Sequence, residues 1–373
     1  MIKATQAQTY ADLRILLSII ALLVILGSIF IYSSSSVYAL ERHGYAHYFL
    51  YRQLIGILVG LCALSIAALI PLKTIHKLTP FLFISSIGLT ALSLVPQFAS
   101  RIHGSSRWIN IAHISFQPSE LLKVGLLLYI AYFLDKKINT QQSILHSFLP
   151  LIIILAIPSI ILLKQPDFGF TATLVSTVLA VCFIAQFQVT PLLISMTGLI
   201  PLVIGLIICY PYRMKRITTF LNPWQDPQGS GFQIIQSLIA IGSGGFWGVG
   251  IGQSRQKFFY LPMQHTDFIF SIIAEEIGFI GIFGLVLLYV FFLYYGLRLA
   301  CAMKNQFSRF FILGFIIVIS LQTIINMAVA TGLAPTKGLG LPFISYGNTG
   351  LVTTLLMVGI VINMVKSEKN KRF

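Results

Sequence analysis

Apolar residues in this chain fall in long, nearly uninterrupted blocks that are separated by shorter polar segments. A helix needs about 20 apolar residues to cross the hydrocarbon core of a bilayer, and about ten blocks come near this length. These blocks are residues 15–34, 50–70, 78–96, 119–134, 147–163, 168–187, 190–209, 268–297, 308–331 and 348–365. The pattern predicts an all-α integral membrane protein, in which a bundle of about ten transmembrane helices forms a single domain over residues 1–373.

The composition agrees with a membrane protein and argues against a soluble one. The chain is 57% hydrophobic and only 9% charged, whereas soluble domains carry about 25% charged residues. The four cysteines, Cys62, Cys182, Cys209 and Cys301, are scattered and form no C-x-x-C pair. Neither a disulfide framework nor a zinc site is therefore predicted. The block at 15–34 is longer than the core of a signal peptide, so it is interpreted as a retained helix.

The basic residues indicate an orientation. With an even number of spans both termini lie on one side, and the short connections on that side are densely basic, which favours the cytoplasm. We therefore expect residues 1–14 and the basic tail 366–373 to be cytoplasmic. The long connection 210–267 would then lie at the outer face, between helices 7 and 8.

Many basic residues remain on the outer side under this orientation, where an anionic partner would explain them. They are Arg101, Arg107, Lys123, Lys164, Arg213, Lys215, Arg216, Arg255, Lys257 and Lys337. Nucleic acid is not expected at this face, so the net charge of +15 is not interpreted as a nucleic-acid footprint. A lipid that carries phosphate fits better.

The connection 210–267 is rich in glycine, proline and aromatic residues, and its apolar stretch 234–241 is too short to span a membrane. Irregular backbone survives at membrane depth only where protein buries it or where it lines a wet cavity. We therefore expect this loop to re-enter the membrane surface in part. The glycines between 242 and 252 fit either tight turns or a cradle for phosphate, and the two interpretations stay open.

Three of the chain's 10 acidic residues lie at the start of the eighth block. Asp267 stands where a helix begins, so helix capping is its simplest role. Glu275 and Glu276 would lie about 12 and 13.5 Å further along the helix. Carboxylates at such depth are either parts of a functional site or paired structural ions, and their company makes a functional role of Asp267 more plausible.

A second charged pair lies in "ISFQPSELLKV", at the start of the fourth block. Pro118 and Glu120 suit the first turn of a helix. Lys123 does not, because a cation is disfavoured at a helix N-terminus. Glu120 and Lys123 are three residues apart and can form a salt bridge, which could steady a third charged group.

Three further polar clusters fall in predicted outer connections: "GSSRWIN" with Arg107, "KQPDFG" with Asp167, and "APTKGLGLPFISYGN" with Lys337, Ser345 and Tyr346. Each could be an ordinary solvated loop, but together they would surround one end of the bundle. The sequence has no His/Cys metal constellation, Ser-His-Asp set or Walker-type loop. No cofactor is predicted with certainty, and assistance by a divalent cation stays open.

Three long motifs resemble the SEDS family of cell-wall polymerases, the group that contains FtsW, RodA and SpoVE. They are "RWINIAHISFQPSELLK", "PTKGLGLPFISYG" and "NPWQDPQGSGFQIIQSLIAIGSGGFWGVGIGQSRQKFFYLPMQHTDFIFSIIAEEIG". The resemblance covers nearly the whole chain, and the second motif is more similar to the FtsW and SpoVE branch than to RodA. It implies a ten-helix bundle in the bacterial cytoplasmic membrane, and a peptidoglycan glycosyltransferase that polymerises lipid II, with septal synthesis in cell division as the expected setting.

The resemblance also assigns residues. Asp267 matches the catalytic aspartate in H-T-D-F, and Glu120 and Lys123 match the polar pair in Q-P-S-E-x-x-K. Two positions depart from the family pattern: Met263 replaces a frequent glutamate, and Asn348 stands in "SYGNTG" where S-Y-G-G-S-S is usual. The first puts a secondary acidic contact in doubt, and the second a close backbone approach.

Residue chemistry and resemblance agree on one mechanism. A carboxylate can remove the proton of an acceptor hydroxyl, and cations can stabilise the departing diphosphate. We expect Asp267 as the base, steadied by Lys123. The expected supporting or substrate-binding residues are Glu120, Lys123, Arg107, Arg213, Arg216, His265, Thr266, Glu275, Glu276, Lys337 and Ser345.

The partners that the resemblance implies are lipid II, glycan linked to undecaprenyl diphosphate, a class B penicillin-binding protein and other division proteins. Two other functions stay open: a transporter of lipid-linked precursors, and a non-catalytic scaffold of the division machinery. A transporter is expected to show internal repeats and discontinuous helices, and neither is evident in the sequence.

Overall fold

The computed structural model describes residues 6–97, 99–102, 105–111, 114–137, 144–187, 197–198, 201, 204–205, 208–258, 262 and 264–370. Most of this chain is helical. The helices are α1 (Gln6–His43), α2 (Tyr48–Leu69), α3 (Leu72–Leu92), α4 (Pro118–Lys137), α5 (Ile144–Lys164), α6 (Phe168–Ile184), α8 (Pro211–Leu221), α9 (Phe232–Gly244), α10 (Ile269–Ala302), α11 (Gln306–Ala330) and α12 (Asn348–Asn370). A short 3-10 turn, η1 (Pro223–Gln225), lies between α8 and α9.

The predicted apolar blocks coincide with α1 to α6 and α10 to α12. The exception is the block 190–209, most of which lies outside the described residues, so a helix there stays a prediction. In the described chain, 6 helices are long and apolar enough to cross a membrane, namely α1, α2, α3, α10, α11 and α12. The helical membrane fold is thus confirmed, whereas the count of ten helices is not tested.

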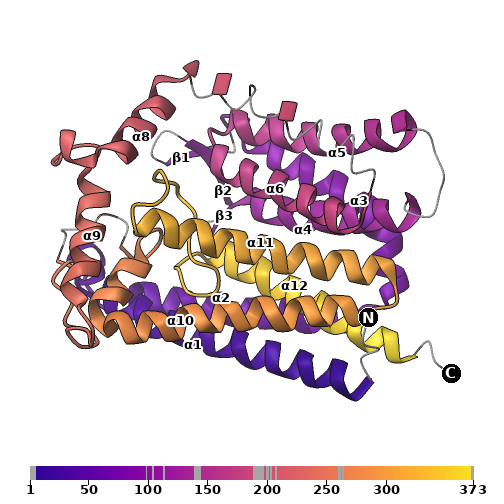
Figure 1. Ribbon diagram of the computed structural model, residues 1–373, viewed down its shortest axis with the longest axis horizontal. Helices are drawn as coiled ribbons and strands as arrows, with labels where there is room; N and C mark the ends of the chain where they lie inside the picture. Colours follow the sequence, from indigo (N-terminus) through magenta and orange to yellow (C-terminus); the bar gives the residue numbers. More distant parts are fainter. Residues whose placement is uncertain are drawn as a thin grey trace.

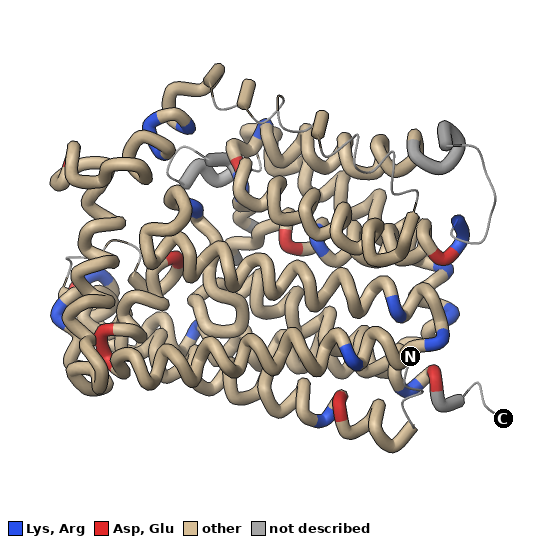
Figure 2. The backbone as a smooth tube through the Cα atoms, viewed as in Figure 1, with Lys and Arg blue, Asp and Glu red and all other residues tan. Residues whose placement is uncertain are grey.

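The long helices run side by side along the length of the molecule (Figure 1). Among the closest neighbours, α12 packs against α2, α1 against α10, and α11 against both α10 and α4. The chain begins α1 and ends α12 at the same end of the bundle, and α8, α9 and the strands lie towards the other end. Figure 2 shows most charged residues towards these two ends, with one acidic and basic pair near the middle of the bundle and long uncharged stretches elsewhere.

A small sheet departs from the all-α prediction. Strands β1 (Ala99–Ile102), β2 (Ser105–Ile111) and β3 (Ile114–Phe116) form a 3-stranded antiparallel sheet just before α4. Trp108 pairs with Ser100 on one side of β2, and Ile109 pairs with Phe116 on the other. The cluster "GSSRWIN", expected as a solvated loop, therefore lies largely on a strand, and the strand fixes the position of Arg107.

Helix α10 is interrupted two residues after its acidic pair, Glu275 and Glu276. Gly278 has φ 63° and ψ −167°, so the helix cannot use all its own hydrogen bonds there. Residues 245–250 supply the missing partners: Val249 N donates to Glu275 O at 3.0 Å, and Phe279 N donates to Gly245 O at 2.9 Å. The irregular backbone is thereby satisfied by protein, as an apolar setting requires.

Replacing Gly278 with alanine is expected to destabilise the protein. The combination of φ 63° and ψ −167° at this position is essentially restricted to glycine and costs any other residue about 1–3 kcal/mol. A Cβ on Gly278 would also stand only 2.7 Å from the Trp247 carbonyl carbon. Thermal unfolding in detergent measures the effect, with Gly88→Ala on α3 as the control, because nothing lies within 4 Å of a Cβ at Gly88. Equal melting temperatures of the two variants would contradict the strain argument.

Candidate functional site

Asp267 lies in the turn that leads into α10, at the end of the bundle that carries β2 and α8. The helix begins at Ile269 with Phe268 as its N-cap residue. Within the described residues the Asp267 carboxylate makes no hydrogen bond to the backbone of α10, so the capping interpretation finds no support. The backbone is held instead by Asn326, whose Nδ2 donates to Asp267 O at 2.8 Å and to Leu339 O at 2.7 Å.

The surroundings of Asp267 poise its carboxyl group for proton transfer near neutral pH. Burial raises the pKa of Asp267 from 3.8 to about 6, even though the charges of Arg107 and Arg216 lower it. Asp167 raises this pKa slightly further. A base is most effective when its pKa lies near the working pH, so this carboxyl group suits that role.

Two arginines next to Asp267 are held by the protein. Arg107 on β2 donates from Nη2 to Pro166 O at 2.7 Å, and its Nε lies 3.4 Å from the Asp167 carboxylate. Arg216 on α8 donates from Nη1 to Thr336 O at 2.9 Å and from Nη2 to the Tyr212 hydroxyl. Both guanidinium groups are therefore fixed in place and retain donors that a ligand could use.

Asp167 organises this side of the site, and the sequence did not assign it a role. It is the N-cap of α6 and accepts a hydrogen bond from Phe170 N at 3.2 Å. Burial raises the pKa of its carboxyl group, while Arg107 and Lys337 lower it. The signal available in the sequence was an aspartate directly after Gln-Pro and before an apolar block, which is a helix-start pattern.

Lys337 comes from the loop between α11 and α12. Its aliphatic chain lies against Gly169, where a Cβ would stand 2.7 Å from Lys337 Cγ. Burial lowers the pKa of Lys337 to about 8, although Asp167 raises it. A Cβ built on the next residue, Gly338, would lie 3.4 Å from Asp267 Oδ2. The loop thus borders Asp267 and carries a cation beside it.

The same loop is fastened to the segment before α10. Ser345 Oγ donates to Thr266 O at 2.6 Å and accepts from Leu341 N at 2.6 Å. Tyr346 N donates to His265 O at 3.0 Å. Ser345, Thr266 and His265 were expected at the site, and these contacts give all three a positioning role through their backbone or hydroxyl groups.

The His265 ring is unsuited to acid–base work at neutral pH. It is buried and packs against the rings of Phe49, Tyr38 and Tyr346, with centroid distances of 4.4, 5.7 and 5.8 Å. Burial lowers the pKa of His265 to about 4. The ring is therefore neutral near pH 7 and acts as part of an aromatic cluster.

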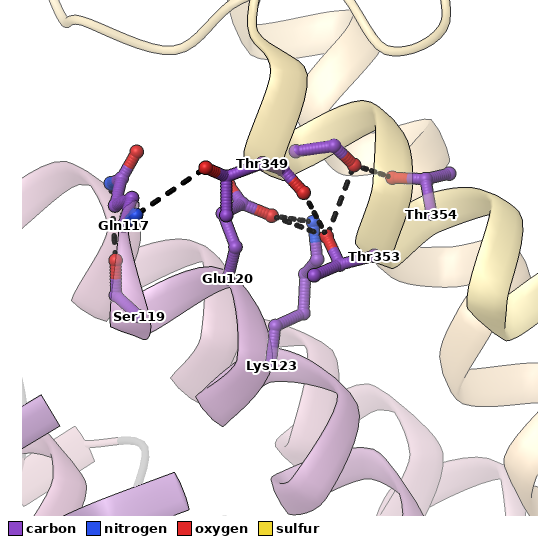
Figure 3. A network of polar contacts seen from close by, with 8 residues as sticks. Gln117, Ser119, Glu120, Lys123, Thr349, Thr353 and Thr354 are labelled. Carbon is purple, nitrogen blue, oxygen red and sulfur yellow. Dashed lines mark hydrogen bonds and ion pairs between the residues drawn. The ribbon is translucent and has the colours of Figure 1, made fainter. Parts of the chain in front are cut away.

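Glu120 and Lys123 form a buried polar network with α12 (Figure 3). Lys123 Nζ donates to Glu120 Oε2 at 2.5 Å, and the Lys123 side chain is only 2% exposed. Thr353 Oγ1 on α12 donates to the same carboxylate oxygen at 3.3 Å. Next to this pair, Gln117 N donates to Thr349 Oγ1 at 3.4 Å. The expected salt bridge is present within α4, and the hydrogen bonds with Thr353 and Thr349 join this helix to α12.

The third charged group beside this pair is Asp167. Glu120 is among the groups that raise the pKa of Asp167. Within the described residues, Lys123 is not among the charged groups that shift the pKa of Asp267, which are Arg107, Arg216 and Asp167. Lys123 forms its salt bridge with Glu120, and the support of Asp267 by Lys123 stays a prediction.

Glu275 and Glu276 hold the large loop and α1 rather than facing Asp267. Glu275 is 1% exposed and accepts from the Ser254 hydroxyl, from Arg255 N at 2.9 Å and from Gln256 N at 3.4 Å. Glu276 accepts from Ser33 Oγ on α1 at 2.5 Å. These contacts are those of structural carboxylates whose donors come from two separate segments, residues 254–256 and α1.

Arg213 differs from the two arginines near Asp267. Its guanidinium stacks over the rings of Tyr210 and Phe168, at 4.4 and 5.3 Å from their centroids. It is not among the groups that shift the pKa of Asp267 in the described part of the chain. Its role at the site stays a prediction. Met263, which departs from the family pattern, lies outside the described residues.

The whole chain can be compared with known proteins. The family model for FtsW, RodA and SpoVE, described as "Cell cycle protein", matches residues 13–370. The chain belongs to this family. Among relatives in it, the probable peptidoglycan glycosyltransferase FtsW of Trichlorobacter lovleyi is 42% identical over 358 residues, which cover 95% of this chain and 92% of the relative. Stage V sporulation protein E of Bacillus subtilis is 39% identical over 369 residues, or 98% and 100% of the two chains.

Solved structures of the FtsW, RodA and SpoVE family share the fold. A chain from work described as "Structural coordination of polymerization and crosslinking by a peptidoglycan synthase complex" matches with a TM-score of 0.79 at 31% identity, over 95% of this chain and 97% of that one. The rod shape determining protein RodA of Thermus thermophilus matches with a TM-score of 0.71 at 28% identity, over 95% and 96%.

Metal ligands are not clustered in the described part of the chain. No group of three or more His, Cys, Asp or Glu side chains in that part of the chain could hold an ion. Cations act on both aspartates of the site: Arg107 and Arg216 on Asp267, and Arg107 and Lys337 on Asp167. Such a set matches an anionic ligand.

Proposed function

We propose that this protein is a peptidoglycan glycosyltransferase that polymerises lipid II into glycan strands at the outer face of the bacterial cytoplasmic membrane. The observation that carries the proposal is a carboxyl group, Asp267, whose pKa is raised to about 6 while Arg107 and Arg216 lie close enough to lower it. A base and cations for a diphosphate are thus side by side. The naming of relatives as probable peptidoglycan glycosyltransferases supports the same activity.

In the proposed reaction, Asp267 removes the proton of the acceptor sugar hydroxyl. The hydroxyl oxygen then bonds to the anomeric carbon of the donor as its bond to the diphosphate breaks. Arg107, Arg216 and Lys337 stabilise the negative charge that develops on the departing diphosphate. Near pH 7 most of the Asp267 carboxyl is ionised, since its pKa is about 6, and the proton it takes is released to solvent after each transfer.

The proposed architecture has ten transmembrane helices, with residues 210–267 as an outer loop between helices 7 and 8. Both termini would be cytoplasmic, which agrees with the start of α1 and the end of α12 at one end of the bundle (Figure 1). Cysteine substitutions at exposed Gln228 and at Asn305 test this orientation. An impermeant thiol reagent applied from outside should label position 228 and spare position 305, and the reverse pattern would overturn the proposed topology.

The proposed partner is a class B penicillin-binding protein that crosslinks the new strands, within a division complex at the septum. The similar chain from a complex described as coordinating polymerisation and crosslinking supports this partnership. The alternatives are a transporter of lipid-linked precursors and a non-catalytic scaffold.

An assay of glycan synthesis from purified lipid II in detergent distinguishes the three functions. A detergent micelle does not separate two compartments, so transport of lipid II cannot contribute to the result. The polymerase should extend glycan strands, with the partner transpeptidase present to activate it. Absence of polymer, together with lipid II transfer across vesicles, would favour the transporter. Absence of both would favour the scaffold. Running the assay with and without EDTA shows whether a divalent cation takes part.

A further inference from the structure

An apolar groove runs between α1 and α10 on the side of the bundle that faces lipid. It has a volume of about 420 Å³ and is lined by aliphatic side chains, Phe30 and two glycines of α10. Ile29 and Ile251 on its rim are 44% and 61% exposed. The groove therefore opens sideways to the hydrocarbon of the membrane.

The shape of this α1–α10 groove fits one hydrocarbon chain. Its lining extends along α10 from Ile273 to Leu288, a distance of about 22 Å at 1.5 Å per residue. Dividing the volume by this length gives a mean cross-section of about 20 Å². A helix with side chains is about 10–12 Å in diameter and has roughly four to five times that cross-section. A partner's transmembrane helix does not fit inside.

The lining of the groove is apolar along its whole length. Glu276 and Ser33 join α10 and α1 beside it, with Ser33 Oγ donating to Glu276 Oε1 at 2.5 Å, but neither residue lines the groove. A polar head group therefore finds no partner inside the groove. The head of a bound lipid is expected beyond the end marked by Ile273, and its tail along α10 towards Leu288.

The end of the groove marked by Ile273 lies on the side of Asp267. Ile273, which lines the groove, follows Asp267 by less than two helical turns. From the other wall, Ile344 lines the groove, and the next residue, Ser345, donates to the carbonyl of Thr266 at 2.6 Å. A lipid in the groove would thus present its head beside the segment that carries Asp267.

We propose that the α1–α10 groove holds the isoprenoid chain of one of the two lipid-linked reactants and so places its sugar near Asp267. The proposal rests on the proposed glycosyltransferase function, because that function supplies a substrate with a single long chain. When the isoprenoid chain moves from the bilayer into the groove, it stays in apolar surroundings and gains little from the transfer. The role of the groove is therefore to position the reacting sugar.

Gly284 allows the groove to be filled without disturbing the fold. It lines the groove, and nothing lies within 4 Å of a Cβ built on it. Gly284→Leu therefore projects a side chain into the space proposed for the lipid. Gly88→Leu on α3 is the matched control: it is also an exposed helical glycine with nothing within 4 Å of its Cβ, but it lies away from the groove.

Polymerisation is measured with lipid II and with an analogue whose isoprenoid chain is too short to enter the groove. In the wild type and in Gly88→Leu the long chain is expected to give the lower KM. In Gly284→Leu the KM for the long chain should rise about tenfold, the low end of what methylene-scale changes in an apolar pocket produce, while the short analogue is used as before. An unchanged preference in Gly284→Leu would overturn the proposal.

A second measurement does not depend on turnover. Lipid II with a photoreactive group at the end of its chain should label peptides of α1 or α10 in the wild type, and less so in Gly284→Leu. Unlabelled lipid II should compete with the labelling. Equal competition by phosphatidylglycerol would assign the groove to bulk phospholipid and overturn the proposal. Labelling without any polymerisation would support the groove and count against the proposed activity.

Discussion

Replacing Asp267 with asparagine is expected to lower glycan formation from lipid II by about 10²–10⁴-fold, the usual loss when a positioned base is removed. Asparagine keeps the size of the side chain and its ability to accept a hydrogen bond, but it cannot take a proton. Arg107 and Arg216 stay in place, because their contacts are to Pro166, Asp167 and Thr336 rather than to Asp267. The loss should therefore appear in kcat, with KM little changed.

The same variant should not lose stability. Burial raises the pKa of Asp267 in the folded state from 3.8 to about 6, so the folded state holds this proton more tightly than the unfolded state does. The stability from this protonation is fully present below pH 4 and is lost as the pH rises through 6. Near pH 7 the ionised carboxylate then costs on the order of 3 kcal/mol. Asp267→Asn removes that cost, and its melting temperature should equal or exceed that of the wild type.

The pH dependence provides a further check on Asp267. In the wild type, polymerisation should fall as the pH drops through about 6, because protonated Asp267 cannot act as a base. The residual activity of Asp267→Asn should lack this acidic limb. A well-folded asparagine variant that polymerises at near-normal rates, with the transpeptidase partner present, would show that Asp267 is not the base. The search would then turn to Glu120, Glu275 and Glu276.

The helices were predictable because each must carry enough apolar residues to cross a membrane, a requirement that the sequence displays directly. Only the predicted helix at 190–209 could not be compared with the structure, because most of it lies outside the described residues. The interruption of α10 was not predictable, since Gly278 stands in an apolar run and its partners, residues 245–250, come from a distant loop. The strand that carries Arg107 was missed because a short polar segment before a helix has the composition of a loop.

A site residue was predictable where its own sequence surroundings indicate its role. It was less predictable where the role depends on a contact between two residues that are distant in the sequence. Asp267 stood out as a carboxylate at the entrance to an apolar block. Asp167 and Arg107 are 60 positions apart, and nothing in either segment indicates that they meet at 3.4 Å. His265 was expected among substrate-binding groups, but its burial among aromatic rings leaves it neutral, and burial of that kind depends on the packing of α1 and α2 around it.

The Glu120–Lys123 pair carries the second large expected effect, on stability. The Lys123 side chain is 2% exposed, and within the described residues its one salt bridge is to Glu120 at 2.5 Å. Removing one partner of a buried pair leaves a charge without compensation and costs about 3–5 kcal/mol. Glu120→Gln alone and Lys123→Met alone are both expected to lower the free energy of unfolding by such amounts.

The double variant Glu120→Gln, Lys123→Met should lose much less than the sum of the single variants, because it leaves no unpaired charge between α4 and α12. Thr353→Val is the matched control, since it removes a hydroxyl that donates to the same carboxylate at 3.3 Å and to the carbonyls of Thr349 and Gly350, but no charged group. It should cost about 1–2 kcal/mol. Thermal unfolding in detergent compares all four variants with the wild type. Additive losses would show that the two charges do not stabilise each other and would contradict the argument from a buried pair.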